Sequence, residues 1–146
     1  MTRLEYLRAI LVEAEAFLDD AVEELADIKA WLMIHREKDN FGPFHVFIGL
    51  VTLQHRRASR VMDLMHLVHR RMIFTSQRTL NELRRSRSIA PEALHMATQM
   101  RHLAERSGRI CKIIGDLFDH DFIGLTQHVV LLSQTNSELQ PSPSKD

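Results

Sequence analysis

Residues 4–32 read LEYLRAILVEAEAFLDDAVEELADIKAWL, and this stretch decides the fold. Apolar residues recur in it at alternating spacings of three and four through four heptads. This period places the apolar side chains on one stripe of an α-helix, and other helices must cover that stripe. We therefore predict one uninterrupted helix over residues 2–36, packed in a bundle. The stripe consists of Leu4, Leu7, Leu11, Ala14, Leu18, Ala21, Leu25, Ile28 and Leu32.

Two further apolar stripes predict two more long helices. Asn40 and Gly42 suit the end of the first helix, and Pro43 suits the start of the second, which extends to Arg85. Pro91 marks the start of the third helix. The second stripe contains Phe44, Phe47, Val51, Ala58, Val61, Met65, Val68 and Met72. The third contains Ala93, Ala97, Met100, Leu103, Ile110, Ile114 and Phe118.

Two places in these helices allow an interruption. Thr75 and Ser76 would permit a kink in the second helix, and the group at 119–121, followed by Gly124, would cap the third helix and begin a shorter fourth one. The fold class that follows is all-α, an antiparallel bundle of three long helices, with a shorter fourth helix left open. We expect one domain over residues 1–135 and a disordered C-terminal tail over residues 136–146.

Composition limits the class of protein. The chain has 146 residues, 45% of them hydrophobic, which is enough for one packed domain. Its single cysteine, Cys111, excludes an internal disulfide, and charges interrupt the first eighteen residues, unlike the core of a signal peptide. The longest apolar run, residues 44–53, is about half of the ~20 residues that a membrane span requires. We expect a soluble, cytoplasmic protein without a membrane span.

The formal net charge of zero hides an uneven distribution. Residues 1–30 hold eight acids and three bases, whereas residues 51–112 hold thirteen bases and four acids. On helical angles, an acidic strip and a basic strip both face away from the core, so neither can fully cover the other. We predict that these strips bind a protein partner or a second copy. The acidic strip is Glu13, Asp20, Glu23, Glu24 and Asp27, and the basic strip is Arg56, Arg60, Arg70 and Arg71.

An anion or a nucleic acid is the alternative ligand for the arginines. Arg84, Arg85 and Arg87 extend the basic strip, and Phe74 lies on the same outward side, where it would stack on a base. The simpler interpretation is that cations in the last helical turn complement the helix dipole. Nucleic acid therefore remains an alternative that we do not favour.

A metal or haem sensor is the third hypothesis. His66 and His69 lie one helical turn apart, so both imidazoles can meet one ion. No third ligand evidently points inward beside them, and histidines that hydrogen-bond at a helix seam explain the pair more simply. A ferritin-like di-iron site requires inward carboxylates and two Glu-x-x-His pairs, which this sequence lacks. We predict no cofactor.

Catalysis has no positive support in the sequence. The chain shows neither a nucleophile elbow nor a glycine-rich loop that would hold phosphate. The function that we predict is therefore a non-enzymatic helical interaction module, such as an adaptor, chaperone or regulator, which is expected to form homo-oligomers. Its charged outer faces and methionine-rich seams would provide the binding surface.

Overall fold

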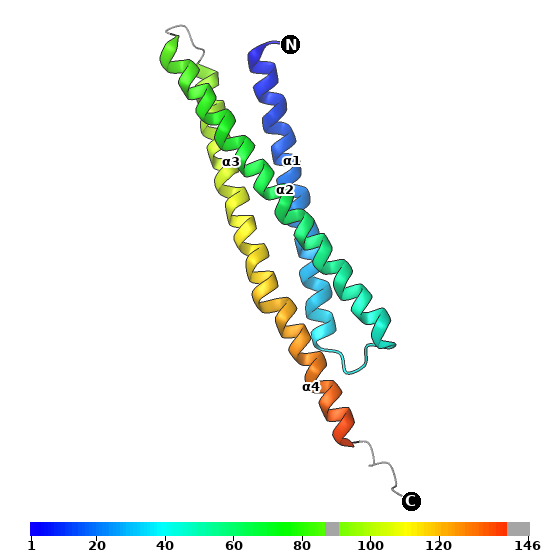
Figure 1. Ribbon diagram of the computed structural model, residues 1–146. Helices are drawn as coiled ribbons and strands as arrows, with labels where there is room; N and C mark the ends of the chain where they lie inside the picture. The colour runs from blue at the N-terminus through cyan, green and yellow to red at the C-terminus, as the bar shows by residue number, and fades with distance from the viewer. Residues whose placement is uncertain (87–90, 140–146) are drawn as a thin grey trace, which may run out of the picture.

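The computed structural model describes residues 1–86 and 91–139, and the helices in it form one elongated bundle (Figure 1). The elements are α1 (Arg3–Arg36), α2 (Phe44–Arg85), α3 (Pro91–Asp116), the π-helical segment η1 (Leu117–Phe122) and α4 (Ile123–Leu139). Helix α2 runs antiparallel to α1, and α3 runs antiparallel to α2 (Figure 1). The described residues contain no strand, so the predicted all-α class is confirmed.

Helix α1 matches its prediction closely. Its N-terminus is a capping box, in which the Glu5 amide donates to Thr2 Oγ1 at 3.2 Å and the Thr2 amide donates to a Glu5 carboxylate oxygen at 3.1 Å. Of the predicted stripe, Leu4 alone is only half-buried, and the other eight residues are buried. Leu18 is 0% exposed. The stripe is therefore the α1 side of the core.

The turn between α1 and α2 lies where it was predicted. Gly42 has φ 72°, a left-handed conformation that glycine adopts without strain, and its amide donates to Asn40 Oδ1 at 2.9 Å. Helix α2 then begins directly after Pro43 and runs unbroken to Arg85, without an interruption at Thr75 or Ser76. Phe44, which was assigned to the core stripe, is instead 67% exposed because it lies at the free end of α2.

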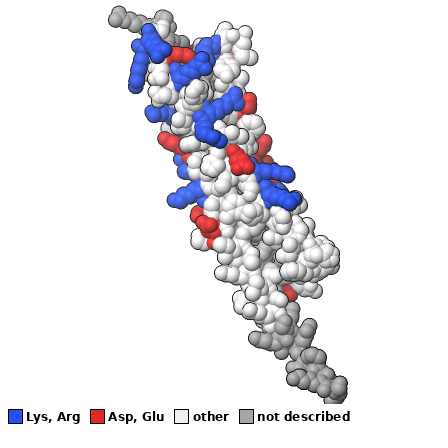
Figure 2. Space-filling view, viewed as in Figure 1, with Lys and Arg blue, Asp and Glu red and all other residues white. Residues whose placement is uncertain are grey.

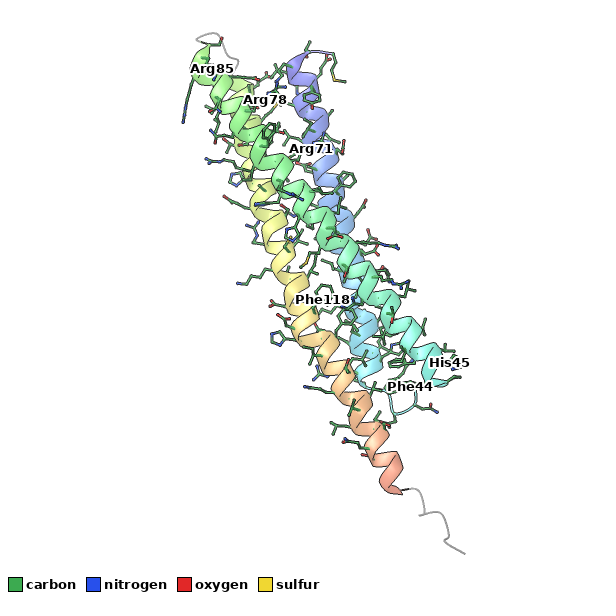
Figure 3. All side chains as sticks on the ribbon, viewed as in Figure 1. Phe44, His45, Arg71, Arg78, Arg85 and Phe118 are labelled. Atoms are coloured by element: carbon green, nitrogen blue, oxygen red, sulfur yellow. The ribbon has the colours of Figure 1, made fainter. Side chains whose placement is uncertain are left out.

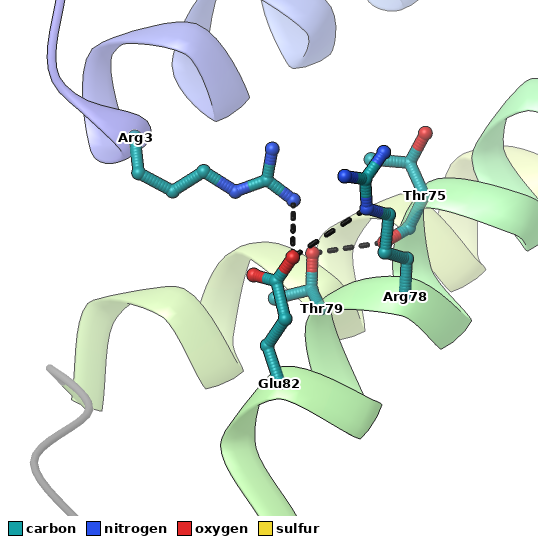
Figure 4. Close-up of polar contacts among 5 residues, drawn as sticks. All are labelled: Arg3, Thr75, Arg78, Thr79 and Glu82. Atoms are coloured by element: carbon teal, nitrogen blue, oxygen red, sulfur yellow. Dashed lines mark hydrogen bonds and ion pairs between the residues drawn. The ribbon is translucent and has the colours of Figure 1, made fainter. Parts of the chain in front are cut away.

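Small residues let α2 and α3 approach each other closely along much of their length. Thr79 and Ser107 are polar but buried, and each donates to a carbonyl of its own helix: Thr79 Oγ1 to the Thr75 carbonyl at 2.8 Å (Figure 4) and Ser107 Oγ to the Ala104 carbonyl at 2.8 Å. Among the described residues, every buried side-chain nitrogen and oxygen has a hydrogen-bond partner. The close-packed side chains include Ala58, Ser76, Thr79, Ala97, Ala104 and Ser107.

At residues 119–121, where the sequence allowed an interruption, the chain stays helical and only the type of helical turn changes. Residues 117–122 form a π-helical segment, and α4 continues from it in line with α3 (Figure 1). Leu117 and Phe122, five residues apart, are both buried, which fits the wider π turn. The fourth helix thus extends the third instead of folding back onto the bundle.

The helix extends further toward the C-terminus than the predicted domain end. Helix α4 ends at Leu139, whereas the domain was expected to end at residue 135. The rest of the predicted tail, residues 140–146, lies outside the described residues. Because α1 ends at Arg36 and its loop returns the chain to α2, the last turns of α4 project past the bundle (Figure 1).

Candidate functional site

The acidic strip on α1 divides into a paired part and an unpaired part. A Glu13 carboxylate oxygen lies 3.0 Å from an Arg71 nitrogen, and a Glu24 carboxylate oxygen lies 2.8 Å from Arg57 Nε. Both arginines are on α2. Asp20, Glu23 and Asp27 are exposed, and no ion pair within residues 1–86 and 91–139 engages them.

The basic strip on α2 is divided in the same way. Arg71 lies against α1 through Glu13, so one member of each predicted strip meets the other within a single chain. Arg56, Arg60 and Arg70 are exposed, and none of the ion pairs found in the described part of the chain includes them. The charges left for another molecule are therefore three acids and three arginines on different helices.

We expect the Glu13–Arg71 pair to contribute little to stability. Both side chains are about half exposed, and exposed ion pairs of this kind contribute ~0–1 kcal/mol. A double-mutant cycle with Glu13→Gln and Arg71→Gln, followed by urea unfolding, should return a coupling energy in that range that falls with added salt. A coupling of several kcal/mol would show that the pair is part of the folding core.

Other ion pairs join the helices through charges that the sequence analysis did not single out. Arg106 of α3 pairs with Asp19 of α1, with nitrogen and oxygen 3.0 Å apart. Glu82 of α2 accepts from Arg3 of α1 and lies 3.5 Å from Arg78 (Figure 4). These residues flank the apolar stripes, and that flank position is the sequence signal that could have identified them.

The nucleic-acid alternative rests on α2. Phe74 is 67% exposed and lines a shallow hollow of about 380 Å³ with Arg78 and Arg85. Figure 3 shows Arg71, Arg78 and Arg85 spaced along the C-terminal half of α2. Arg84 is exposed, whereas Arg87 lies outside the described residues. The hollow also contains Glu82, whose carboxylate already binds two arginines and would repel a phosphate.

The histidine pair is divided between two different contacts. His69 Nδ1 lies 2.8 Å from the Ala104 carbonyl oxygen, which can only accept, so the ring donates across the α2–α3 seam. His66 Nδ1 lies 3.8 Å from Cys111 Sγ, and burial raises the pKa of that thiol. Within the described residues, no group of three or more His, Cys, Asp or Glu side chains is placed to hold a metal ion.

The methionines of the predicted seams are part of the core. Met65, Met72 and Met100 are almost completely buried between the helices, and Met96 is buried beside them. Their flexible side chains fill the interior of the bundle. These four methionines are therefore not accessible to a partner, and Met62 is partly buried against the same core.

An apolar surface at the opposite end of the molecule was missed. A groove of about 250 Å³ runs between the start of α2 and α4. Large apolar side chains on its rim are exposed, with Phe44 at 67%, Val130 at 49% and Ile48 at 44%. We call this surface the apolar groove; its walls are Phe44, Phe47, Ile48 and Val51 on α2 and Leu125, Thr126, Val129, Val130, Ser133 and Gln134 on α4.

The apolar groove is also free of charged side chains. Residues 44–53 and 123–135 contain no Asp, Glu, Lys or Arg. Figure 2 shows the blue and red side chains gathered over the other part of the visible face, while this end is largely white. The missing charges were visible in the sequence, but the run at residues 44–53 was compared with a membrane span, and Phe44, Phe47 and Val51 within it were assigned to the core stripe of the second helix.

Aromatic packing supports the groove from beneath. Phe47 is buried, with its ring centroid 4.4 Å from that of Phe41 and 6.1 Å from that of Trp31. His128 of α4 donates through Nε2 to the Lys38 carbonyl at 2.8 Å, which ties α4 to the α1–α2 loop. The two walls are therefore fixed to one base, and the groove is formed before any ligand arrives.

Comparison with known proteins adds no assignment. No protein family, no curated protein and no solved structure matches this chain. Within residues 1–86 and 91–139, no helix combines the length and the apolar character that crossing a bilayer requires.

Proposed function

We propose that this protein is a non-catalytic helical interaction module that binds a helix of another polypeptide in its apolar groove. The observation that carries the proposal is the exposure of Phe44, Ile48 and Val130 around a hollow between two helices. An exposed apolar patch rimmed by polar side chains is typical of a surface that binds protein.

The shape of the groove favours a helix as its ligand. Two roughly aligned helices form the walls, and the α2 wall presents side chains one turn apart at Phe44, Ile48 and Val51. An amphipathic helix presents apolar side chains at the same spacing, so that they interdigitate with those of the walls. At about 250 Å³ the groove is smaller than the ~300–1,000 Å³ of most small-molecule sites.

The composition of the surface favours protein over lipid. Helices that lie on membranes carry Lys or Arg on their polar face, where the cations meet anionic headgroups. Residues 44–53 and 123–135 have neither. The unpaired charges lie elsewhere on α1 and α2, where Asp20, Glu23 and Arg60 would steer the approach of a partner and affect the association rate more than the affinity.

We expect Ile48→Glu to abolish partner binding, because the carboxylate would be buried without a counter-charge when the groove is filled. The measurement is affinity capture with the tagged protein from its native cell, comparing the retained proteins quantitatively. Val12→Glu is the matched control, since Val12 is also exposed but lies on α1. A partner retained equally by both variants would disprove the assignment of the groove.

A second candidate function, nucleic-acid binding, has one observation in its favour. Phe74 is exposed between Arg71 and Arg78 on the outer side of α2, and stacking on an aromatic side chain contributes ~1–3 kcal/mol per base. Nucleic acid that copurifies with the wild type and is lost with Phe74→Ala would support it. The Ile48→Glu variant should leave such binding unchanged.

A further inference from the structure

The end of α4 extends beyond the rest of the bundle. The hydrogen bond from His128 to the Lys38 carbonyl joins α4 to the loop at the bundle's end, and the following residues to Leu139 continue past that loop (Figure 1). Val130 and Leu131 are exposed in this segment. Most of the stability of a helix in a protein comes from tertiary packing of its apolar face, which these two exposed side chains lack. The segment would therefore gain stability from a neighbouring helix.

We propose that a second copy of this chain is that neighbour, related by a two-fold axis that faces the apolar groove. The start of α2 and α4 of each copy would together form a four-helix bundle, with the groove of one copy filled by side chains of the other. This inference rests on the proposed function, since it uses the same groove. It goes beyond the proposed function by naming a second copy of this chain as the molecule that fills the groove.

The distribution of charge favours a second copy. A two-fold axis brings a surface against itself, so any charged group near the axis meets the same charge on the other copy. The acidic strip of α1 or the exposed arginines of α2 would be opposed in this way. The apolar groove meets no such repulsion, because residues 44–53 and 123–135 contain no charged side chain.

The size of the surface fits a reversible dimer. The uncharged part of α4, residues 123–135, is about 20 Å long at ~1.5 Å per residue, and two helices side by side are about 20 Å wide. The resulting face is on the order of 400 Å² in projection, below the ~800 Å² per partner of a standard stable interface. We therefore expect a dimer that dissociates in the micromolar range, not a permanent one.

Val130→Glu is the variant that tests dimerisation through the apolar groove. It would place two unpaired carboxylates near the two-fold axis, so we expect the dimer dissociation constant to rise by at least ~100-fold. Sedimentation equilibrium over a series of protein concentrations measures that constant. Val12→Glu adds the same charge on α1, away from the groove, and should dimerise like the wild type. Because burial of apolar side chains drives this dimer, raising the salt concentration should not weaken it.

Thr126→Arg gives a second test that does not depend on Val130. Thr126 is an exposed side chain on the α4 wall, so a charge there is tolerated in the monomer and should disrupt the dimer equally. Circular dichroism of each variant confirms that the monomer remains folded. Dimers weakened by both groove variants, and not by Val12→Glu, would support the inference.

Three results would contradict the proposal that a second copy of the chain fills the apolar groove. One is a wild-type monomer at every concentration, and another is a dimer that neither groove variant weakens. The third is a dimer that dissociates at high salt, which would assign the contact to the charged strips. None of these refutes the proposed function, provided that Ile48→Glu still abolishes capture of a different protein. If the protein does not dimerise through the groove and Ile48→Glu still captures the same proteins as the wild type, both proposals are refuted.

Discussion

Leu18→Ala should lower the free energy of unfolding by ~2–5 kcal/mol, because the deleted atoms lose their burial and the rigid bundle leaves a cavity behind. Leu18 is 0% exposed and lies midway along α1, where Leu11 and Leu25 flank it in the same stripe. Neither end of the helix can fray to fill the space. Chemical denaturation with urea, followed by circular dichroism at the helix band, measures the change.

Val22→Ala is the matched control for this prediction. Val22 lies one turn further along α1 and is about half exposed, so its truncation should change the free energy of unfolding by less than ~0.5 kcal/mol. The two variants share the helix and the type of replacement, and differ mainly in burial. Equal stability of the two proteins would show that α1 does not form the core assigned to it.

Helix α1 was predictable because three kinds of local signal agree in it. Thr2 and Glu5 form a capping box, the apolar stripe keeps its period, and Gly42 with Pro43 separates it from the next helix. Consistency between local signals and tertiary packing is typical of natural sequences. For α2 and α3 the apolar period and a proline at or just before the first turn predicted the start, without a side-chain cap on α2.

The polar seam between α2 and α3 could not be predicted in this way. Thr75, Ser76 and Thr79 are buried, although a hydropathy pattern assigns hydroxyl side chains to the surface. Thr79 satisfies its hydroxyl within its own helix, so it can face α3 without an unpaired donor. What selects these residues is their size, since small side chains allow two helices to approach closely.

The π-helical segment at residues 117–122 also could not be predicted from the local sequence. Asp119 and Asp121 are common helix-capping residue types, and the sequence therefore allowed a break there. The chain remains helical because the Phe118 and Phe122 rings pack on His55, at centroid distances of 4.7 Å and 5.3 Å. This contact comes from α2, so the residues around position 120 contain no sign of it.

The candidate site was predicted least well, for a geometric reason. Helical angles show that Glu13 and Arg71 point away from the centre of their own stripes, but they do not show which helix lies beside each flank. In the folded chain these two side chains meet. The apolar groove was missed for a related reason, since α1 packs against Phe47 beneath the groove and leaves Phe44 and Val130 exposed on its rim.

Ala104→Leu should also destabilise the protein, by ~1–3 kcal/mol, because the added methylenes have no space where α2 and α3 approach closely. Ala104 is 0% exposed, and its carbonyl accepts from His69 Nδ1 of α2 at 2.8 Å. To fit a leucine, α2 must move away, which would break this bond. Urea unfolding measures the loss of stability, and the NMR signal of the His69 Nδ1 proton reports whether the bond survives.

Ala26→Leu separates the effect of overpacking from that of the substitution itself. Ala26 is exposed on α1, and leucine has almost the same helix propensity as alanine, so this variant should keep the wild-type stability. If Ala104→Leu instead stabilised the protein and kept the His69 proton signal, the seam would have to contain unfilled space. The α2–α3 contact would then resemble an ordinary leucine-packed pair, and its small residues would need another explanation.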